Sequence, residues 1–171
     1  NSTYFYPFGK QEHCLPDGEI YCIREVQDGV LLGYSNCKLV WVNALTKNVV
    51  EVDEHLQDFY SKESGYPEFQ LLQDRNKNVW VVTTQGLHVY MHNTEKWVDS
   101  LESLGLKMEQ PISTYENMLK CLSSDDLGNI YIGSDKTGLL KINLDSWTLT
   151  ASQHKSEDSR SLCSNSVQSI F

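Results

Sequence analysis

The segment from Ser124 to Tyr131 holds the densest set of groups that could do chemistry. It reads Ser-Asp-Asp-Leu-Gly-Asn-Ile-Tyr, and its adjacent carboxylates, Asp125 and Asp126, are of the kind that binds Ca²⁺. That ion needs about six to eight oxygen ligands, and the other turns of the sequence do not repeat the pair of carboxylates. Because Asx and glycine turn chemistry accounts for each residue of the segment, we predict a structural turn here rather than a metal site.

The histidines offer neither a metal site nor a catalytic couple. Of the five histidines, only His88 and His92 are close in sequence. Residues four apart on an extended strand are separated by about 13 Å, which is too far for one metal ion. No glycine-rich phosphate loop, nucleophile elbow or Cys–His pair is visible, and the acidic residues form no recognisable acid–base couple. The sequence predicts no catalytic residue, no metal and no cofactor, and therefore a segment that is not an enzyme.

Aromatic side chains are the remaining candidates for ligand contact, because sugar rings stack on aromatic faces. Four tyrosines near predicted loops could serve in this way, namely Tyr34, Tyr60, Tyr66 and Tyr115. Other rings fall at strand positions and are expected to pack in the core, including Trp80, Trp97, Tyr131 and Trp147. The sequence assigns no ligand-binding residue.

The charge balance excludes several classes of partner. The 171 residues include 23 acidic and 14 basic side chains, which give a formal net charge of −9. This charge repels the phosphate backbone of nucleic acids and the surface of anionic lipid. The longest apolar runs extend over a few residues, whereas a bilayer crossing needs about 20. We expect no nucleic acid contact and no membrane segment in this piece.

The cysteines give no framework that would define the fold. Cys14, Cys22, Cys37, Cys121 and Cys163 show neither a CxxC motif nor metal-ligand spacing. Most are expected to be buried thiols, and one disulfide stays open as an alternative if the compartment is oxidising.

The elements that would position these groups follow a repeat of about fifty residues. The most apolar segment occurs three times, at residues 30–34, 79–83 and 130–134, with offsets of 49 and 51 residues. The segment before it recurs four times, around Ile23, Leu71, Leu122 and Ile170. A period of this length with four short strands in each unit is typical of a β-propeller.

Each unit is predicted to hold four short antiparallel strands joined by tight turns, without a sustained helical stripe. The strand at 79–83 is apolar at nearly every position, as expected of a strand covered on both faces. Gly86 and Gly138, between second and third strands, are expected to adopt positive φ. Residues 53–60 are expected to form one or two helical turns. We predict an all-β fold, namely a β-propeller fragment of about three four-stranded antiparallel blades in an incomplete ring.

The repeat also divides the chain into segments. It assigns residues 1–19 to an outer strand of a preceding blade and a linker, 20–67 to a first blade, 68–117 to a second, 118–165 to a third, and 166–171 to the first strand of a next blade. Propeller rings usually close with about four to eight blades, so three blades leave apolar faces and strand edges bare. We therefore expect a longer parent chain or self-association of copies.

Three segments carry a resemblance to a known family. They are residues 73–81 (Gln-Asp-Arg-Asn-Lys-Asn-Val-Trp-Val), residues 128–139, where Gly-Asn-Ile-Tyr-Ile-Gly-Ser is followed by Gly-Leu, and residues 161–171 (Ser-Leu-Cys-Ser-Asn-Ser-Val-Gln-Ser-Ile-Phe). They resemble the two-component regulator propeller repeat, and the resemblance covers nearly all of residues 20–171. The second copy has Val82 where the family has glycine, and the first copy keeps only Gly33 and its turn.

The resemblance implies the periplasmic sensor region of a membrane-bound hybrid two-component histidine kinase and response regulator, which regulates transcription. It further implies an oligosaccharide ligand released from glycans, and contact with the rest of the receptor chain. A ligand-free propeller scaffold for dimerisation or protein–protein interaction is the alternative. A propeller hydrolase or lyase would require carboxylates or a metal that converge in a central channel.

Overall fold

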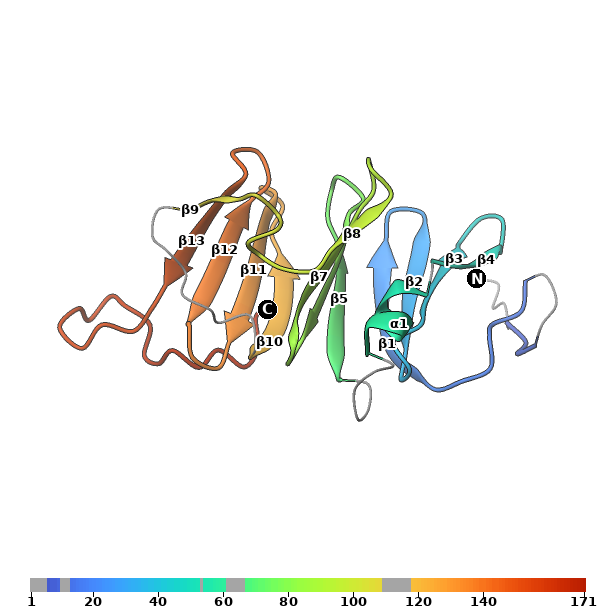
Figure 1. Ribbon diagram of the computed structural model, residues 1–171, viewed down its shortest axis with the longest axis horizontal. Coiled ribbons are helices and arrows are strands. Elements are labelled where there is room, and N and C mark those ends of the chain that lie inside the picture. The colour runs from blue at the N-terminus through green and yellow to red at the C-terminus, as the bar shows by residue number, and fades with distance from the viewer. Residues whose placement is uncertain (1–5, 10–12, 53, 61–66, 109–117) are drawn as a thin grey trace. The chain divides into compact units, whose positions relative to one another are not determined.

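The computed structural model of the protein describes residues 6–9, 13–52, 54–60, 67–108 and 118–171, and Figure 1 shows it as a ribbon. Two compact units make up the chain, Asn1–Tyr66 (unit 1) and Pro67–Phe171 (unit 2), and each is considered by itself. Strands dominate both units, and α1 (His55–Tyr60) is the helix among the described residues. The predicted all-β class and the short helix near residues 53–60 are confirmed. Within the described ranges, no helix has the length and hydropathy that a bilayer crossing requires.

Unit 1 contains one antiparallel sheet, which α1 follows in the chain. Its strands are β1 (Ile20–Val26), β2 (Gly29–Tyr34), β3 (Leu39–Asn43) and β4 (Val49–Glu51), in the order β1-β2-β3-β4. One face of this sheet forms a small core with the segment that precedes it, made of Leu15, Leu32, Tyr34, Val40 and Val42. Leu15 is 8% exposed, so the preceding segment covers this face of the sheet.

Unit 2 contains two further antiparallel sheets (Figure 1). The second sheet has the strands β5 (Phe69–Gln73), β6 (Val79–Thr83), β7 (Gly86–Met91) and β8 (Lys96–Val98). The third sheet has β10 (Leu119–Ser124), β11 (Asn129–Ser134), β12 (Leu139–Asn143) and β13 (Thr148–Ser152). A short strand, β9 (Lys107–Met108), adds to β13 in parallel and was not predicted from the repeat. Three four-stranded meanders, none of them closed, confirm the predicted propeller-like fragment.

The two sheets of unit 2 share one apolar core. The second sheet contributes Trp80, Val82, Leu87 and Val89, and the third sheet contributes Ile130, Ile132, Leu140 and Ile142. These eight side chains are 0–2% exposed. All five residues of β6 are buried, which agrees with the expectation for a strand that lacks polar alternation. Burial of apolar surface at this density is the main force that holds the two sheets together.

Of the two glycines predicted to adopt positive φ in the turns between second and third strands, only one does so. Gly138 has a φ of 81°, as expected. Gly86 does not adopt positive φ, so that prediction is wrong. Oγ1 of Thr83 accepts the N–H groups of Gln85 and Gly86 at 3.0 and 2.9 Å. Gly86 is already the first residue of β7 and pairs with Thr83, whereas Gly138 lies in the turn before β12.

The predicted end segments are only partly accounted for. Within residues 1–19, which were expected to hold an outer strand and a linker, residues 1–5 and 10–12 lie outside the described residues, and Phe8 forms an isolated bridge with Leu15. Residues 166–171 form no strand, contrary to expectation. The segment instead packs Val167 against Gly133, where an added Cβ would lie 2.8 Å from Cγ1 of Val167, and the N–H of Val167 donates to the carbonyl of Ser134 at 2.7 Å. The other boundaries between blades stay predictions.

We predict that Leu140→Ala lowers the free energy of unfolding by about 2–5 kcal/mol, because it leaves a cavity in the shared core of unit 2. Leu140 is 1% exposed. Leu127→Ala is the matched control in the same unit, since Leu127 is 74% exposed and its loss should change stability by less than about 0.5 kcal/mol. Urea unfolding followed by circular dichroism measures both. Equal effects of the two substitutions would contradict the assigned core.

Candidate functional site

The turn between β5 and β6 is organised by the carboxylate of Asp74. Its Oδ1 accepts the backbone N–H groups of Asn76 and Asn78 at 2.8 and 2.9 Å. Its Oδ2 accepts Nδ2 of Asn78 at 2.9 Å and Nε1 of Trp80 at 2.8 Å. Asp74 is 6% exposed. A carboxylate with four donors directed at it has used the lone pairs that a cation would need.

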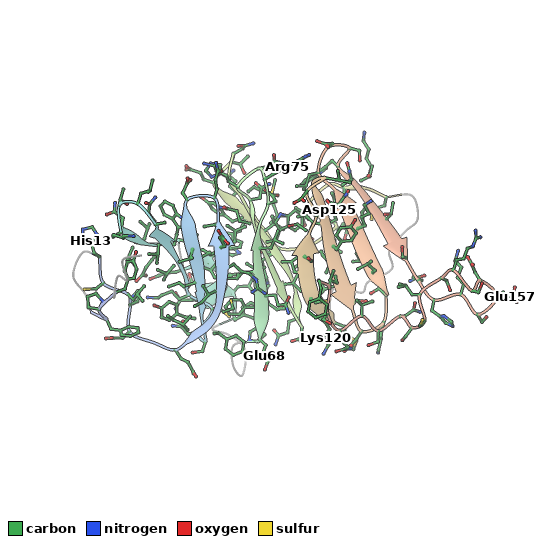
Figure 2. The ribbon with its side chains drawn as sticks, turned by 180° about the vertical axis from the view of Figure 1, so that it is seen from behind. His13, Glu68, Arg75, Lys120, Asp125 and Glu157 are labelled. Carbon is green, nitrogen blue, oxygen red and sulfur yellow. The ribbon has the colours of Figure 1, made fainter. Side chains whose placement is uncertain are left out.

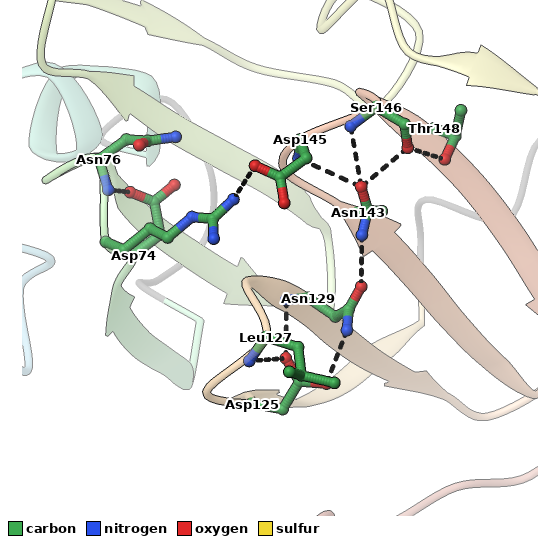
Figure 3. A network of polar contacts seen from close by, with 10 residues as sticks. Asp74, Asn76, Asp125, Leu127, Asn129, Asn143, Asp145, Ser146 and Thr148 are labelled. Atoms are coloured by element: carbon green, nitrogen blue, oxygen red, sulfur yellow. Dashed lines mark hydrogen bonds and ion pairs between the residues drawn. The ribbon is translucent and has the colours of Figure 1, made fainter.

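The turn between β10 and β11 repeats this arrangement around Asp125 (Figure 3). Oδ1 accepts the N–H groups of Leu127 and Asn129 at 3.0 and 2.8 Å, and Oδ2 accepts Nδ2 of Asn129 at 2.7 Å and the hydroxyl of Tyr131 at 3.0 Å. The hydrogen bonds from Asn129, with those from Tyr131 and Leu127, lower the pKa of Asp125 from 3.8 to about 2. These bonds close the turn, as the structural interpretation of this segment predicted.

As expected, the turn of the second sheet does not repeat the pair of carboxylates, but it does repeat the rest of the arrangement. The second sheet reproduces the carboxylate, the asparagine and the ring that bonds to it, through Asp74, Asn78 and Trp80. What it lacks is the second, adjacent carboxylate, since Arg75 stands where the third sheet has Asp126. The shared spacing Asp-x-x-x-Asn-x-aromatic is visible in the sequence and is the signal by which this network could have been found.

Arg75 links the two sheets of unit 2. Its guanidinium group crosses the turn at Gly128 and forms an ion pair with Asp145, in the turn between β12 and β13 (Figure 3). Gly128 is buried beneath it and has a φ of 77°, and a Cβ there would collide with the guanidinium group. Glycine at this position therefore serves both the turn and the passage of Arg75.

A groove of about 310 Å³ lies beside this ion pair. Its walls come from the first turns of the second and third sheets, and from Ile130 and Leu144. Two of its carboxylates, Asp74 and Asp125, are already bonded within their own turns. The exposed Asp126 is the remaining acidic group in the wall. The geometry favours a structural role for the groove over a ligand-binding one.

A second polar cluster lies at the other end of β11, as the labels Asp125 and Lys120 show in Figure 2. Asp135 pairs with Nζ of Lys120 at 3.1 Å and accepts hydrogen bonds from Nε2 of Gln168 at 2.7 Å and from the hydroxyl of Ser166 at 3.2 Å. Lys120 first, and then Gln168 and Ser166, lower the pKa of Asp135. The cluster fastens the C-terminal segment to the third sheet.

Unit 1 contains a pocket of about 420 Å³ whose polar groups are less occupied. It is lined by Gly9, Cys14, Pro16, Asp17, Lys38, Val49 and Glu51. Nζ of Lys38 lies 3.1 Å from both carboxylate oxygens of Glu51. The pocket combines an ammonium group, two carboxylates and a thiol with the apolar surfaces of Pro16 and Val49.

Two of the four tyrosines considered from the sequence as possible stacking platforms are buried. Tyr34 and Tyr60 are each 1% exposed, so their rings cannot meet a ligand. Tyr66 and Tyr115 lie outside the described residues. Trp80 is fully buried in the core, as predicted. Sequence position near a loop was a poor guide here, because both described tyrosines turn inward.

The two neighbouring histidines have different surroundings. His88, on β7, is 1% exposed and its Nδ1 lies 2.7 Å from Oδ1 of Asp99. His92 lies beyond the end of β7, and its backbone N–H donates to Oδ1 of Asn78. The absence of a catalytic residue or cofactor stays a prediction.

The five cysteines are free thiols. Cys37 and Cys121 are buried, and burial raises the pKa of Cys37 to about 12. Cys14 and Cys22 are half-buried and Cys163 is exposed, so the expectation that most of the thiols are buried is wrong.

Solved structures with this fold include proteins of the class whose repeat the sequence resembles. No family model and no curated protein matches the sequence. An extracellular domain from B. thetaiotaomicron, of a protein assigned as a hybrid two-component system, is similar over 92% of this chain, with 24% identity and a TM-score of 0.60. A second such domain from the same organism is similar over 92%, with 18% identity and a TM-score of 0.55. The chain spans 19% and 18% of these two structures.

A third similar structure is a protein of unknown function from B. thetaiotaomicron. It matches 84% of this chain and is matched over 39% of its own length, with 13% identity and a TM-score of 0.54. At these identities, the likeness establishes the fold.

We predict that Gly128→Ala destabilises the protein more than Gly105→Ala. Both glycines have positive φ, 77° and 65°, so each alanine carries a conformational strain of about 1–2 kcal/mol. A Cβ at Gly105 meets no atom within 4 Å, whereas one at Gly128 displaces Arg75. Urea unfolding of both variants, alone and with Arg75→Ala, isolates this contact. A difference that persists in the Arg75→Ala background would contradict the role of Arg75.

We predict that the turn at Asp125 weakens at low pH. The folded pKa of about 2 lies below the usual 3.8, so the stabilisation is complete above pH 3.8 and is lost as the pH falls towards 2. The difference in unfolding free energy between the native protein and Asp125→Asn should therefore narrow over this range. Asp126→Asn, which alters the adjacent exposed carboxylate, is the control. A difference that stays constant with pH would refute the assigned network.

Proposed function

We propose that this chain is part of the periplasmic ligand-sensing region of a hybrid two-component receptor that regulates transcription. The observation that carries the proposal is the likeness of nearly the whole chain to two extracellular domains assigned to such systems. The repeat motifs, which resemble the two-component regulator propeller repeat, support it independently. Because the chain spans about a fifth of those structures, the rest of the receptor is its first partner in this proposal.

The proposed ligand is an oligosaccharide, and the proposed segment does not catalyse its conversion. A glycan suits a propeller surface whose polar side chains are spread over several turns, because many hydroxyl groups must be met at once. Binding would act by favouring one arrangement of the receptor over another, which requires a difference in affinity between the two arrangements. In this scheme residues 20–67, 68–117 and 118–165 form three successive blades, and residues 1–19 supply part of a preceding one.

A ligand-free scaffold for dimerisation is the second candidate. It is favoured by one observation: Asp74, Asp125 and Asp135 are each occupied by hydrogen bonds within unit 2. Self-association belongs to both candidates. The exposed edge strand β1, where Tyr21 and Ile23 are 47% and 57% exposed, offers a surface for it.

We predict that the protein binds neutral oligosaccharides in a calorimetric titration against a panel of plant and host glycan fragments. Weak binding at micromolar to millimolar concentration is expected for hydroxyl recognition on a surface of this kind. Anionic uronate oligomers are the control and should bind less, because the net charge of −9 repels them. Light scattering of the same samples reports association. A constant dimer with no binding across the panel would favour the scaffold and count against the sensor.

A further inference from the structure

The pocket in unit 1 stands apart from the other polar clusters, because its groups still have unused hydrogen-bonding capacity. The ammonium group of Lys38 has three N–H donors; it hydrogen-bonds Oε1 of Glu51 at 3.1 Å, and Oε2 lies at the same distance from Nζ. Each oxygen of Glu51 keeps a further lone pair. Asp17 accepts no hydrogen bond from any residue that the structure describes. Donors and acceptors therefore lie side by side in one pocket.

This pairing matches a particular ligand chemistry. A sugar hydroxyl both donates and accepts a hydrogen bond, so adjacent hydroxyls can bridge an ammonium group and a carboxylate. Pro16 and Val49 supply apolar wall for the C–H face of a sugar ring. The volume of about 420 Å³ lies within the range usual for small-molecule sites.

The walls of the pocket are fixed before any ligand arrives. The hydroxyl of Tyr34 donates to the carbonyl of Pro16 at 3.2 Å. Its ring lies against Gly18, where an added Cβ would be 2.9 Å from Cδ1 of the ring. Oδ1 of Asn36 accepts the backbone N–H of Lys38 at 3.2 Å. Pre-organised walls lower the entropy that binding must overcome.

The charge of the pocket selects among sugars. Asp17 and Glu51 outnumber Lys38, and the chain as a whole carries −9. Burial raises the pKa of Tyr34, and the negative charges of Glu51 and Asp17 raise it further. A negative site repels uronates and sulfated sugars.

We propose that the pocket formed by Asp17, Lys38 and Glu51 binds a terminal unit of a neutral oligosaccharide. Hydroxyl groups of that unit bond to Lys38 and Glu51, while Pro16 and Val49 contact its ring. This inference rests on the proposed sensing function and assigns its binding site.

The test compares two pocket variants with one matched control. Lys38→Met and Glu51→Gln keep the side-chain size, and each removes one of the two charged groups that would bind the sugar hydroxyls. Lys120→Met removes an ion pair of the same 3.1 Å length, with Asp135, in unit 2. Cellotetraose and maltotetraose serve as neutral probes, and trigalacturonate as the anionic probe. Thermal unfolding of every variant confirms that it is folded before its affinity is measured by calorimetry.

Cys14 provides a second, local measurement. It lines the pocket and is half-buried, whereas Cys163 is exposed in the other unit. Bound sugar should slow alkylation of Cys14 by iodoacetamide and leave alkylation of Cys163 unchanged, as read by peptide mass spectrometry.

The expected result is a loss of about ten-fold or more in affinity for the neutral probe in both pocket variants, since each loses a hydrogen bond to a charged group. Lys120→Met should bind as the native protein does. If the native protein binds but both pocket variants keep their affinity, or Cys14 is not protected, the pocket is wrong and the sensing function stands. If the native protein binds no sugar, both proposals fail together.

Discussion

The order of unit 2 depends on one carboxylate in the first turn of each of its sheets. Asp74 closes its turn through two backbone N–H groups and also holds the indole N–H of Trp80, whose ring is fully buried in the shared core. A buried indole N–H without an acceptor costs about 1–3 kcal/mol. The polar turn and the apolar packing are therefore coupled, because Asp74 both shapes the turn and accepts the hydrogen bond from the buried indole. Tyr131, which is half-buried, donates its hydroxyl to Asp125 at the equivalent position of the third sheet.

Periodicity made the sheets predictable, and its failures have local causes. The apolar segments at 79–83 and 130–134 became central strands, since a strand without polar residues has to be covered. The prediction of positive φ failed at Gly86, which pairs with Thr83 at the start of β7 and donates its N–H to the Thr83 hydroxyl. β9 escaped notice because two residues that add to the edge of β13 leave no pattern in the sequence. Residues 166–171 carry the repeat motif but form no strand, and the N–H of Val167 donates instead to the carbonyl of Ser134 at the end of β11.

The contacts that join sheets were beyond the reach of sequence. Arg75 and Asp145 are 70 residues apart, and only the folded turns bring them together across Gly128. The same holds for Asp17, Lys38 and Glu51, which come from three separate stretches of unit 1. By contrast, Asp74 and Asp125 act within their own turns, so their spacing to Asn78 and Asn129 encodes their role directly. Local chemistry can be predicted from spacing, whereas a site assembled from distant segments cannot.

The acidic side chains of this protein differ in how many of their hydrogen-bonding positions remain available to a ligand. Asp74, Asp125 and Asp135 each accept hydrogen bonds from three or more donors of the chain itself. These carboxylates therefore stabilise two turns and the C-terminal segment. In unit 1, Lys38 and Glu51 occupy each other only in part, and a ligand hydroxyl can join them without breaking a structural bond. A side chain that can change its hydrogen-bond partner without disturbing the fold is suited to ligand recognition. Saturation of hydrogen bonds, more than the number of carboxylates, thus separates the groups that build this protein from those that could meet a ligand.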